Sequence, residues 1–159
     1  MKNTLTHEDF MREAIRVSVE NIKSGGGPFG AVIVRDGEII ASSGNRVTAN
    51  NDPTAHAEVM AIRAACQKLK TFDLSGTTIY TSCEPCPMCL GSIYWAHIDK
   101  MYYGNNRQDA AKIGFDDEFI YQEFERPLSE RRLHTEQLIP NEAIEAFEAW
   151  ENNADKIEY

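Results

Sequence analysis

The sequence predicts an α/β fold in which helices cover both faces of one sheet. Segments with the spacing of amphipathic helices alternate with short apolar or β-branched segments typical of strands. The 159 residues are enough for one domain with a substantial core, and no repeat, low-complexity tract or linker divides them. At 42% hydrophobic and 26% charged residues, the composition is typical of a globular protein and too apolar for a disordered one.

The N-terminal part of the chain predicts two helices with a hairpin between them. Thr6 can cap the first helix, and three glycines followed by a proline end it. A charged turn with a glycine at 35–37 separates two extended runs, which favours a hairpin. The apolar face of the first helix is expected to consist of Phe10, Ala14, Ile15, Val19 and Ile22. In order, we expect a helix to about Lys23, strands over 29–34 and 38–43, a polar loop over 45–53 and a helix over 54–69.

The alternation continues to Gly104 and weakens beyond it. A β-branched and aromatic run predicts a strand over 77–81, and the segment after the cysteines predicts a helix over 87–96. The chain ends in an amphipathic helix from Asn141, which has Ile144, Phe147 and Trp150 on one face. The other expected segments are a strand at 100–103, a helix over 107–113, a mixed region over 115–124 and a last strand over 134–139.

The charge balance excludes some partners. Sixteen Lys and Arg residues stand against 25 Asp and Glu residues, which gives a net charge of -9. A polynucleotide binder normally uses a basic surface, so this charge balance argues against nucleic acid as a substrate. The first two dozen residues contain no signal-type apolar run, and no later segment is long enough to cross a bilayer. We therefore expect a cytoplasmic protein with no membrane contact.

Three of the four cysteines lie within one short segment. Cys83, Cys86 and Cys89 crowd into 83–89, and Cys66 is the remaining cysteine. In the cytosol, where structural disulfides are rare, such a cluster is more typical of a metal or redox site than of a disulfide framework. Cys66 lies in the middle of an expected helix and is interpreted as a small core residue.

Two fragments together have the pattern H-x-E…P-C-x-x-C, which is typical of zinc-dependent nucleobase deaminases. The first contains His56 and Glu58, and the second contains Cys86 and Cys89. Three protein ligands leave zinc an open position, where bound water has its pKa lowered to roughly 7. Cys86 and Cys89, three residues apart at a helix start, share a face, and the helix N-terminus favours their thiolates. Glu58 is then expected to move the protons.

The positions of His56 and Glu58 need a helix start close by. In mid-helix, two residues separated by one would point apart, but in a first turn both can reach one metal. Asp52, Pro53 and Thr54 predict that start, because proline is tolerated there and threonine can cap.

Other interpretations of these residues remain open at this stage. Cys83 could replace Cys86 as a ligand, although Pro85 precedes Cys86 as the pattern requires and Cys83 ends a strand. A non-enzymatic zinc module would use His56 and all three clustered cysteines as four closed ligands. A redox C-x-x-C pair is a third reading. We interpret the remaining histidines as surface or structural residues: His7, His97 and His134.

Beyond the metal pattern, the chain resembles the cytidine deaminase-like superfamily and, more closely, its small bacterial guanine deaminases. The superfamily likeness is carried by 28–32, Asn45, 52–58 and 81–89. Features of the guanine branch are 94–96, 114–117 with 119–121, and the closing 156–159. The likeness covers nearly the full length and is weakest from Glu125 to Glu148.

The resemblance implies a three-layer α/β/α sandwich with a central, mixed five-stranded sheet. It implies one zinc-dependent domain over 1–159, one Zn²⁺ per subunit, and a homodimer that exchanges the segment 141–159 between subunits. In the site it implies that Asn45 hydrogen-bonds a purine, that Phe29 and Trp95 hold the ring, and that Ala57 also contacts it. It further implies that Asp117 shares proton transfer with Glu58 and that Tyr159 closes over the site.

The expected reaction is hydrolysis of guanine to xanthine and ammonia. Related substrates compete with it: guanosine, cytosine, another amino-substituted ring, or adenosine in transfer RNA. The RNA substrate is disfavoured by charge, because Lys156 is the one basic residue in 142–159. The acidic residues of that segment are Glu142, Glu145, Glu148, Glu151, Asp155 and Glu158.

Overall fold

The computed structural model describes residues 5–159. The contacts between residues divide the chain into two compact units. The first is Met1–Asp117 and the second is Glu118–Tyr159. The first unit contains the whole sheet, and the second contains helices.

The sheet of the first unit is mixed. Its order is β2-β1-β3-β4, with β1 antiparallel to both of its neighbours and β3 parallel to β4. The parallel pair is joined by a helix, as a parallel connection requires. The strands are β1 (Gly30–Arg35), β2 (Glu38–Gly44), β3 (Thr78–Cys83) and β4 (Lys100–Asn105).

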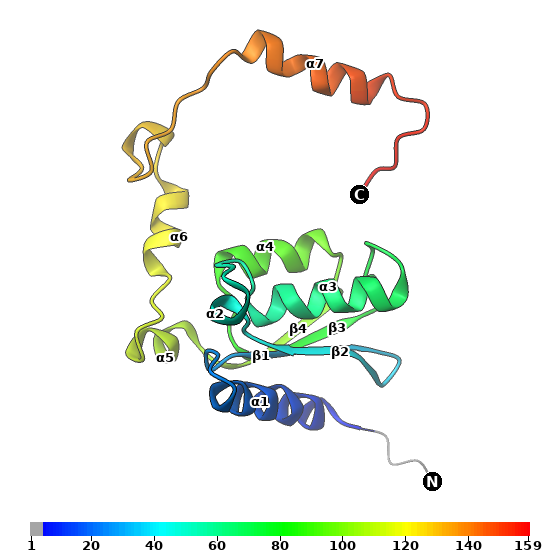
Figure 1. Ribbon diagram of the computed structural model, residues 1–159, viewed down its shortest axis with the longest axis vertical. Helices are drawn as coiled ribbons and strands as arrows, with labels where there is room; N and C mark the ends of the chain where they lie inside the picture. The colour runs from blue at the N-terminus through cyan, green and yellow to red at the C-terminus, as the bar shows by residue number, and fades with distance from the viewer. Residues whose placement is uncertain (1–4) are drawn as a thin grey trace. The chain divides into compact units, whose positions relative to one another are not determined.

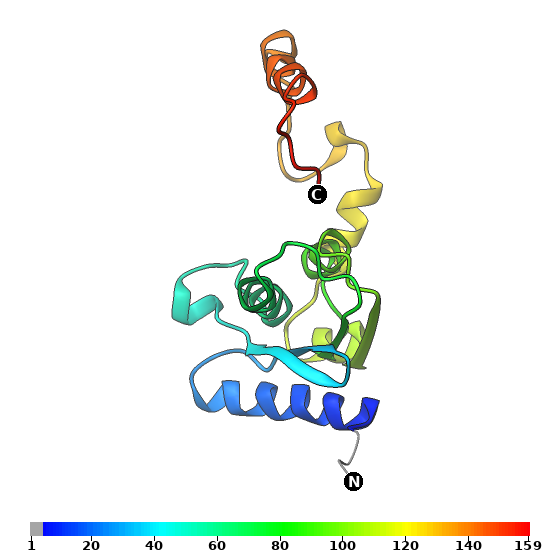
Figure 2. The ribbon, with the colours of Figure 1, turned by 90° about the vertical axis from the view of Figure 1, so that its right-hand side faces the viewer.

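Helices cover both faces of this sheet. Helix α1 (His7–Lys23) lies on one face, and α3 (Ala57–Leu69) and α4 (Pro87–Trp95) lie on the other (Figures 1 and 2). Successive side chains of β1 point to opposite faces of the sheet, as they do along any strand. Val32 packs into the α1 side, while Ala31 and Ile33 pack into the α3 side. The three-layer α/β/α prediction is therefore confirmed.

The first helix begins as predicted but buries a different face. Thr6 forms a capping box with Asp9, in which each side chain accepts a hydrogen bond from the other's backbone N–H. Its buried residues are Phe10, Ala14, Ser18 and Asn21, and the apolar residues Ile15, Val19 and Ile22 are exposed. The prediction for these three was wrong, because the helix is rotated so that Ser18 and Asn21 are buried in their place, beside Phe10 and Ala14.

Helix α3 starts later than the sequence predicted. Its N-cap is His56 and its first residue is Ala57, not Thr54. Asp52 accepts hydrogen bonds from the backbone N–H and the hydroxyl of Thr54, at 2.8 and 2.6 Å, and so forms a separate turn. The expected loop over 45–53 also contains a short helix, α2 (Val47–Asn50).

The sheet has four strands within residues 5–159, and the expected fifth strand over 134–139 was wrong. Leu138 and Ile139 are the only apolar residues of that segment, so it has no alternating pattern. Ile139 also has φ 42°, which lies in the left-handed region and not in the strand region. Pro140 then starts a helix.

The remaining helices follow the sheet in the order α5, α6 and α7. Helix α5 (Arg107–Lys112) ends the first unit's regular structure and confirms the helix predicted there. The second unit consists of α6 (Glu118–Glu125), a short 3₁₀ turn (Leu128–Glu130) and α7 (Pro140–Glu151). Within residues 5–159, no helix combines the length and the apolarity needed to cross a bilayer.

Candidate metal and proton-transfer site

Three predicted metal ligands converge in the first unit. The Nδ1 atom of His56 lies 3.5 Å from the sulfur of Cys86 and 3.4 Å from the sulfur of Cys89. All three ligand atoms lie within 4.8 Å of one another, and they form the one such group among residues 5–159. The structure therefore brings together the three residues that the sequence pattern singled out.

Two helix N-termini position this group. His56 is the N-cap of α3 and Cys86 is the N-cap of α4, while Cys89 lies in the first turn of α4. Pro87 occupies the first helical position of α4, where a proline costs no hydrogen bond. Because α3 and α4 pack side by side, both N-termini face one point. Their positive dipole ends favour thiolates there.

The electrostatics of the two cysteines favour one thiolate before any cation binds. A hydrogen bond from the Cys89 thiol, with a further contribution from His56, lowers the pKa of Cys86 to about 4. The same thiolate raises the pKa of Cys89, and burial raises it further. A bound cation would take over the role of this shared proton. Thiolates and an imidazole are donors that suit zinc and not the oxygen-seeking Mg²⁺ or Ca²⁺, so the donor set fits zinc.

Glu58 lies beside the metal group without belonging to it. The thiol of Cys89 donates to its Oε2 atom at 3.3 Å. The Glu58 side chain is buried, at 8% exposure, and this burial raises its pKa. A carboxyl group with a raised pKa can both accept and return a proton near neutral pH. His56 and Glu58 both lie beside the Cys89 sulfur, as expected. They can do so because α3 begins at His56, its N-cap, and not at Thr54.

Cys83 lies outside the group. It ends β3, is buried, and donates from its sulfur to the carbonyl of Asn106 at 3.8 Å. Burial raises the pKa of this thiol to about 11, which disfavours the thiolate that a metal ligand needs. The structure thus supports Cys86 over Cys83 as the third ligand. Cys66 packs, partly buried, against the core as expected.

Two of the predicted substrate contacts also lie close together. A methyl group placed on Gly27 would lie 3.4 Å from Cδ2 of Phe29 and 3.6 Å from Cγ of Asn45. The ring of Phe29 packs edge-on against Phe115, with centroids 4.9 Å apart. Phe115 belongs to the 114–117 motif of the guanine branch. The sequence did not predict its packing role, because Phe29 and Phe115 are far apart along the chain.

The other predicted site residues are placed less fully. Ala57 is buried in the core beside Glu58. Burial raises the pKa of Asp117; the Cys86 thiolate raises it further, and Arg107 lowers it. Asp117 is thus within electrostatic reach of the metal group. Trp95 ends α4, and Tyr159 belongs to the second unit. Their roles toward a substrate stay predictions.

Sequence reasoning did not single out a polar bridge behind the cysteines. The Oε2 atom of Glu84 accepts a hydrogen bond from the backbone N–H of Arg107 at 3.1 Å, and the Arg107 side chain lies 3.8 Å from Oε1. This bridge ties the cysteine segment to the start of α5. No local spacing signals it, since the partners are 23 residues apart.

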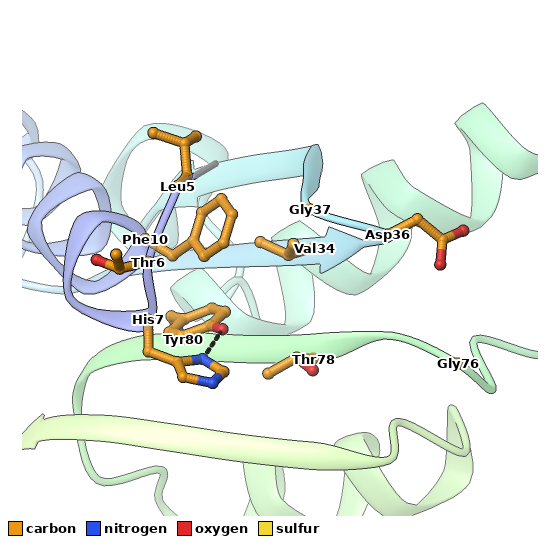
Figure 3. Close-up of a pocket in the computed structure, with 10 residues that line it drawn as sticks. All are labelled: Leu5, Thr6, His7, Phe10, Val34, Asp36, Gly37, Gly76, Thr78 and Tyr80. Atoms are coloured by element: carbon orange, nitrogen blue, oxygen red, sulfur yellow. Dashed lines mark hydrogen bonds between the residues drawn. The ribbon is translucent and has the colours of Figure 1, made fainter. Parts of the chain in front are cut away.

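A second hollow of the first unit lies away from this chemistry. A cavity of about 480 Å³ lies beside the start of α1, and none of the predicted site residues lines it. Figure 3 shows the residues that line this cavity. In it the Nδ1 atom of His7 lies 2.7 Å from the hydroxyl of Tyr80, and the ring of His7 packs against Tyr102. His7 is therefore a structural residue, as expected.

The donor set, the adjacent buried carboxyl and the α/β/α fold together define a zinc-dependent hydrolytic deaminase. Residues 4–105 match the family described as the cytidine and deoxycytidylate deaminase zinc-binding region, and the chain belongs to this family. The family match favours an enzyme over the structural zinc module and the redox pair that the sequence left open.

The chain is also similar to individual family members. It is 51% identical over 156 residues to a guanine deaminase of Bacillus subtilis, which covers 98% of this chain and 100% of that protein. The crystal structure of guanine deaminase from Bacillus subtilis superposes with a TM-score of 0.95 over 98% of this chain and 99% of that chain. A tRNA-specific adenosine deaminase of Agrobacterium fabrum is also 51% identical, but over only 48% of this chain and 51% of that protein.

Proposed function

We propose that this protein hydrolyses guanine to xanthine and ammonia. One observation carries the proposal: the donors of His56, Cys86 and Cys89 converge while the buried carboxyl of Glu58 touches the Cys89 sulfur at 3.3 Å. The likeness to the Bacillus subtilis guanine deaminase, which extends over both chains, supports guanine as the substrate.

His56, Cys86 and Cys89 would hold the zinc. When bound, zinc acts as a Lewis acid that makes water a nucleophile at neutral pH. The water oxygen adds to the ring carbon that carries the amino group, and the bond from this carbon to nitrogen then breaks. Glu58 would take one proton from the water and give it to the neighbouring ring nitrogen, and would then carry the second proton, from the added hydroxyl, to the amino group, which leaves as ammonia. General acid–base catalysis of this kind contributes roughly 10²–10⁴-fold in rate.

Other residues of the first unit would bind the ring. The Oδ1 atom of Asn45 accepts a hydrogen bond from the backbone N–H of Val47 at 3.1 Å. This bond leaves the Nδ2 group of Asn45 as a donor for a ring oxygen or nitrogen. Phe29 and Trp95 would hold the faces of the ring, with Ala57 against its edge, and Asp117 would assist Glu58 in proton transfer.

We further propose a homodimer in which the segment 141–159 is exchanged, so that Tyr159 closes over the partner's site. The apolar residues Ile144, Phe147 and Trp150 of α7 are all exposed, which supports a role in covering another surface. The mass of the protein in solution, measured by light scattering, tests the dimer, and a monomer at working concentrations would refute it.

The substrate is tested by ammonia release from guanine, guanosine, adenine, cytosine, cytidine and a transfer RNA, measured side by side. We expect guanine to be strongly preferred, and preferential turnover of the RNA would overturn the proposal. The second candidate, transfer RNA, has only the partial likeness in its favour, and the acidic composition of 142–159 opposes it.

The role of Glu58 is tested by Glu58→Gln, which should keep zinc and lose turnover by about 10²–10⁴-fold. Glu38→Gln, at the exposed start of β2, is a matched control that should keep full activity. Near-normal ammonia release from Glu58→Gln would contradict the assignment.

A further inference from the structure

Asn21 is a buried polar residue that the proposed chemistry does not use. It lies in the last turn of α1, on the helix face that packs against the sheet, and its side chain is only 8% exposed. Buried amide groups require hydrogen-bond partners, since an unpaired one costs about 1–3 kcal/mol. The partners of Asn21 therefore indicate what it holds together.

The Asn21 amide joins two segments that are far apart in sequence. Its Nδ2 group donates to the carbonyl of Gly27 at 2.8 Å and to the carbonyl of Asn45 at 2.9 Å. These segments are also joined directly, because the N–H of Asn45 donates to the carbonyl of Phe29 at 3.2 Å. Asn21 thus holds the backbone at Asn45 and at Gly27, which lies two residues before Phe29.

Two glycines leave the space that the Asn21 side chain fills. A methyl group on Gly26 would lie 2.8 Å from Cγ of Asn21, and one on Gly44 would lie 2.8 Å from its Cβ. Real Cβ atoms essentially never approach so closely. Neither glycine has a positive φ, so close approach, and not backbone freedom, explains why both positions lack a side chain.

The clamped segment continues to the metal group. The N–H of Arg46 donates to the carbonyl of Ala55 at 2.8 Å, and Ala55 directly precedes His56. Asn45 is therefore held on one side by Asn21 and on the other by the backbone next to a metal ligand. These two attachments fix where its side chain stands relative to the metal group.

We propose that Asn21 is a positioning residue that acts through Asn45 and sets how the ring is presented to the metal site. The identity of the ring rests on the proposed function, whereas the clamp itself does not. Asn21 does not touch the reacting atoms, and removing its amide should loosen the segments 25–29 and 44–47 without disturbing the metal ligands.

The test compares Asn21→Leu, which keeps the branching of the side chain and removes both hydrogen bonds, with Ser18→Ala. Ser18 is the matched control, because it is buried one turn earlier on the same face and its hydroxyl bonds only within α1, to Ile15. We expect Asn21→Leu to raise the KM for guanine about tenfold, while kcat changes less than about threefold and zinc content is unchanged. Ser18→Ala should leave KM unchanged.

A double-mutant cycle separates positioning from a general loss of stability. In the background of Asn45→Ala, Asn21→Leu should change KM less than about twofold, because the residue through which it acts is gone. Additive effects on KM would overturn the proposal. If Asn21→Leu does not fold, Asn21→Ser takes its place.

Hydrogen exchange tests the clamp independently of the substrate. Asn21→Leu should exchange faster than the wild type in 25–29 and 44–47 but not in β3, and unchanged protection would refute the clamp. If the wild-type protein does not deaminate guanine, the proposed function fails, and the exchange result still decides whether Asn21 holds Asn45.

Discussion

The two units of the chain differ in how their apolar residues are used. In the first unit, residues from both faces of the sheet form two clusters that are nearly inaccessible to water. In the second unit no side chain is buried, and large apolar residues such as Leu133, Leu138 and Phe147 are more than 70% exposed. The first unit therefore contains its own source of stability, and the second has none comparable.

The two units also differ in how many of the predicted site residues they contain. The metal group, Glu58, Asn45 and the Asn21 clamp all belong to the first unit, whereas Tyr159 is the one predicted site residue in the second. Exposed apolar side chains on an amphipathic helix usually mark a surface that another surface covers. The metal group and its proton-transfer residue are therefore built within the first unit alone.

Removal of zinc is the largest perturbation of the first unit. Dialysis against a strong chelator should abolish turnover and lower the melting temperature, because the ion links the starts of α3 and α4. Restored activity after zinc is added back, measured with the metal content, would confirm this. Cys86→Ala should lose zinc, whereas Cys83→Ala should keep it, and equal zinc loss in both variants would reopen the choice of ligand.

Truncation of the second unit tests whether it completes the site. Deleting 156–159 should lower kcat/KM for guanine by about 10- to 100-fold, because a misplaced closing residue costs factors of this size. The melting temperature should stay unchanged, since the segment contributes nothing to the buried core. Tyr159→Phe, which keeps the ring, serves as the control, and a fully active truncation would remove Tyr159 from the site.

Two alanine substitutions, one in each unit, compare how much a large apolar side chain contributes to stability in each. Ile33→Ala removes a fully buried side chain of β1 and should cost about 2–5 kcal/mol of unfolding free energy. Phe147→Ala removes a side chain that is 73% exposed and should cost less than about 0.5 kcal/mol in the isolated subunit. Chemical denaturation measures both values. If Phe147→Ala instead weakens a dimer, as dilution experiments would reveal, α7 covers a partner.

The same division explains how much the sequence could predict. Local signals sufficed for the cap at Thr6, the hairpin and the helix start that holds Cys86 and Cys89. A spacing of three residues at a helix N-terminus already places Cys86 and Cys89 on one face. The family resemblance supplied Asn45, Asp117 and the other ring contacts, which no local spacing indicates.

The wrong prediction for the buried face of α1 depended on contacts between distant segments. Hydrophobicity alone placed Ile15, Val19 and Ile22 toward the sheet, but the positions facing it are taken by Ser18 and Asn21. Asn21 is buried there because Gly26 and Gly44, which lie far apart in the sequence but both contact Asn21, leave space for its side chain. The other wrong predictions failed for local reasons. The segment 134–139 lacks the alternating pattern of a strand, and Asp52 with Thr54 forms a turn before α3.

A further expected effect, smaller than that of Ile33→Ala, concerns the cap of α1. Thr6→Ala should cost about 1 kcal/mol, because it removes the side chain that accepts the N–H of Asp9. Hydrogen bonds from the backbone and then from the side chain of Thr6 lower the pKa of Asp9 below its unfolded value. The contribution of this carboxylate is therefore present above the unfolded pKa and is lost as the pH falls through the lower folded pKa. Urea titrations at neutral and acidic pH should show the difference between wild type and Thr6→Ala shrinking in acid, and a difference independent of pH would exclude a role for the Asp9 carboxylate in the cap.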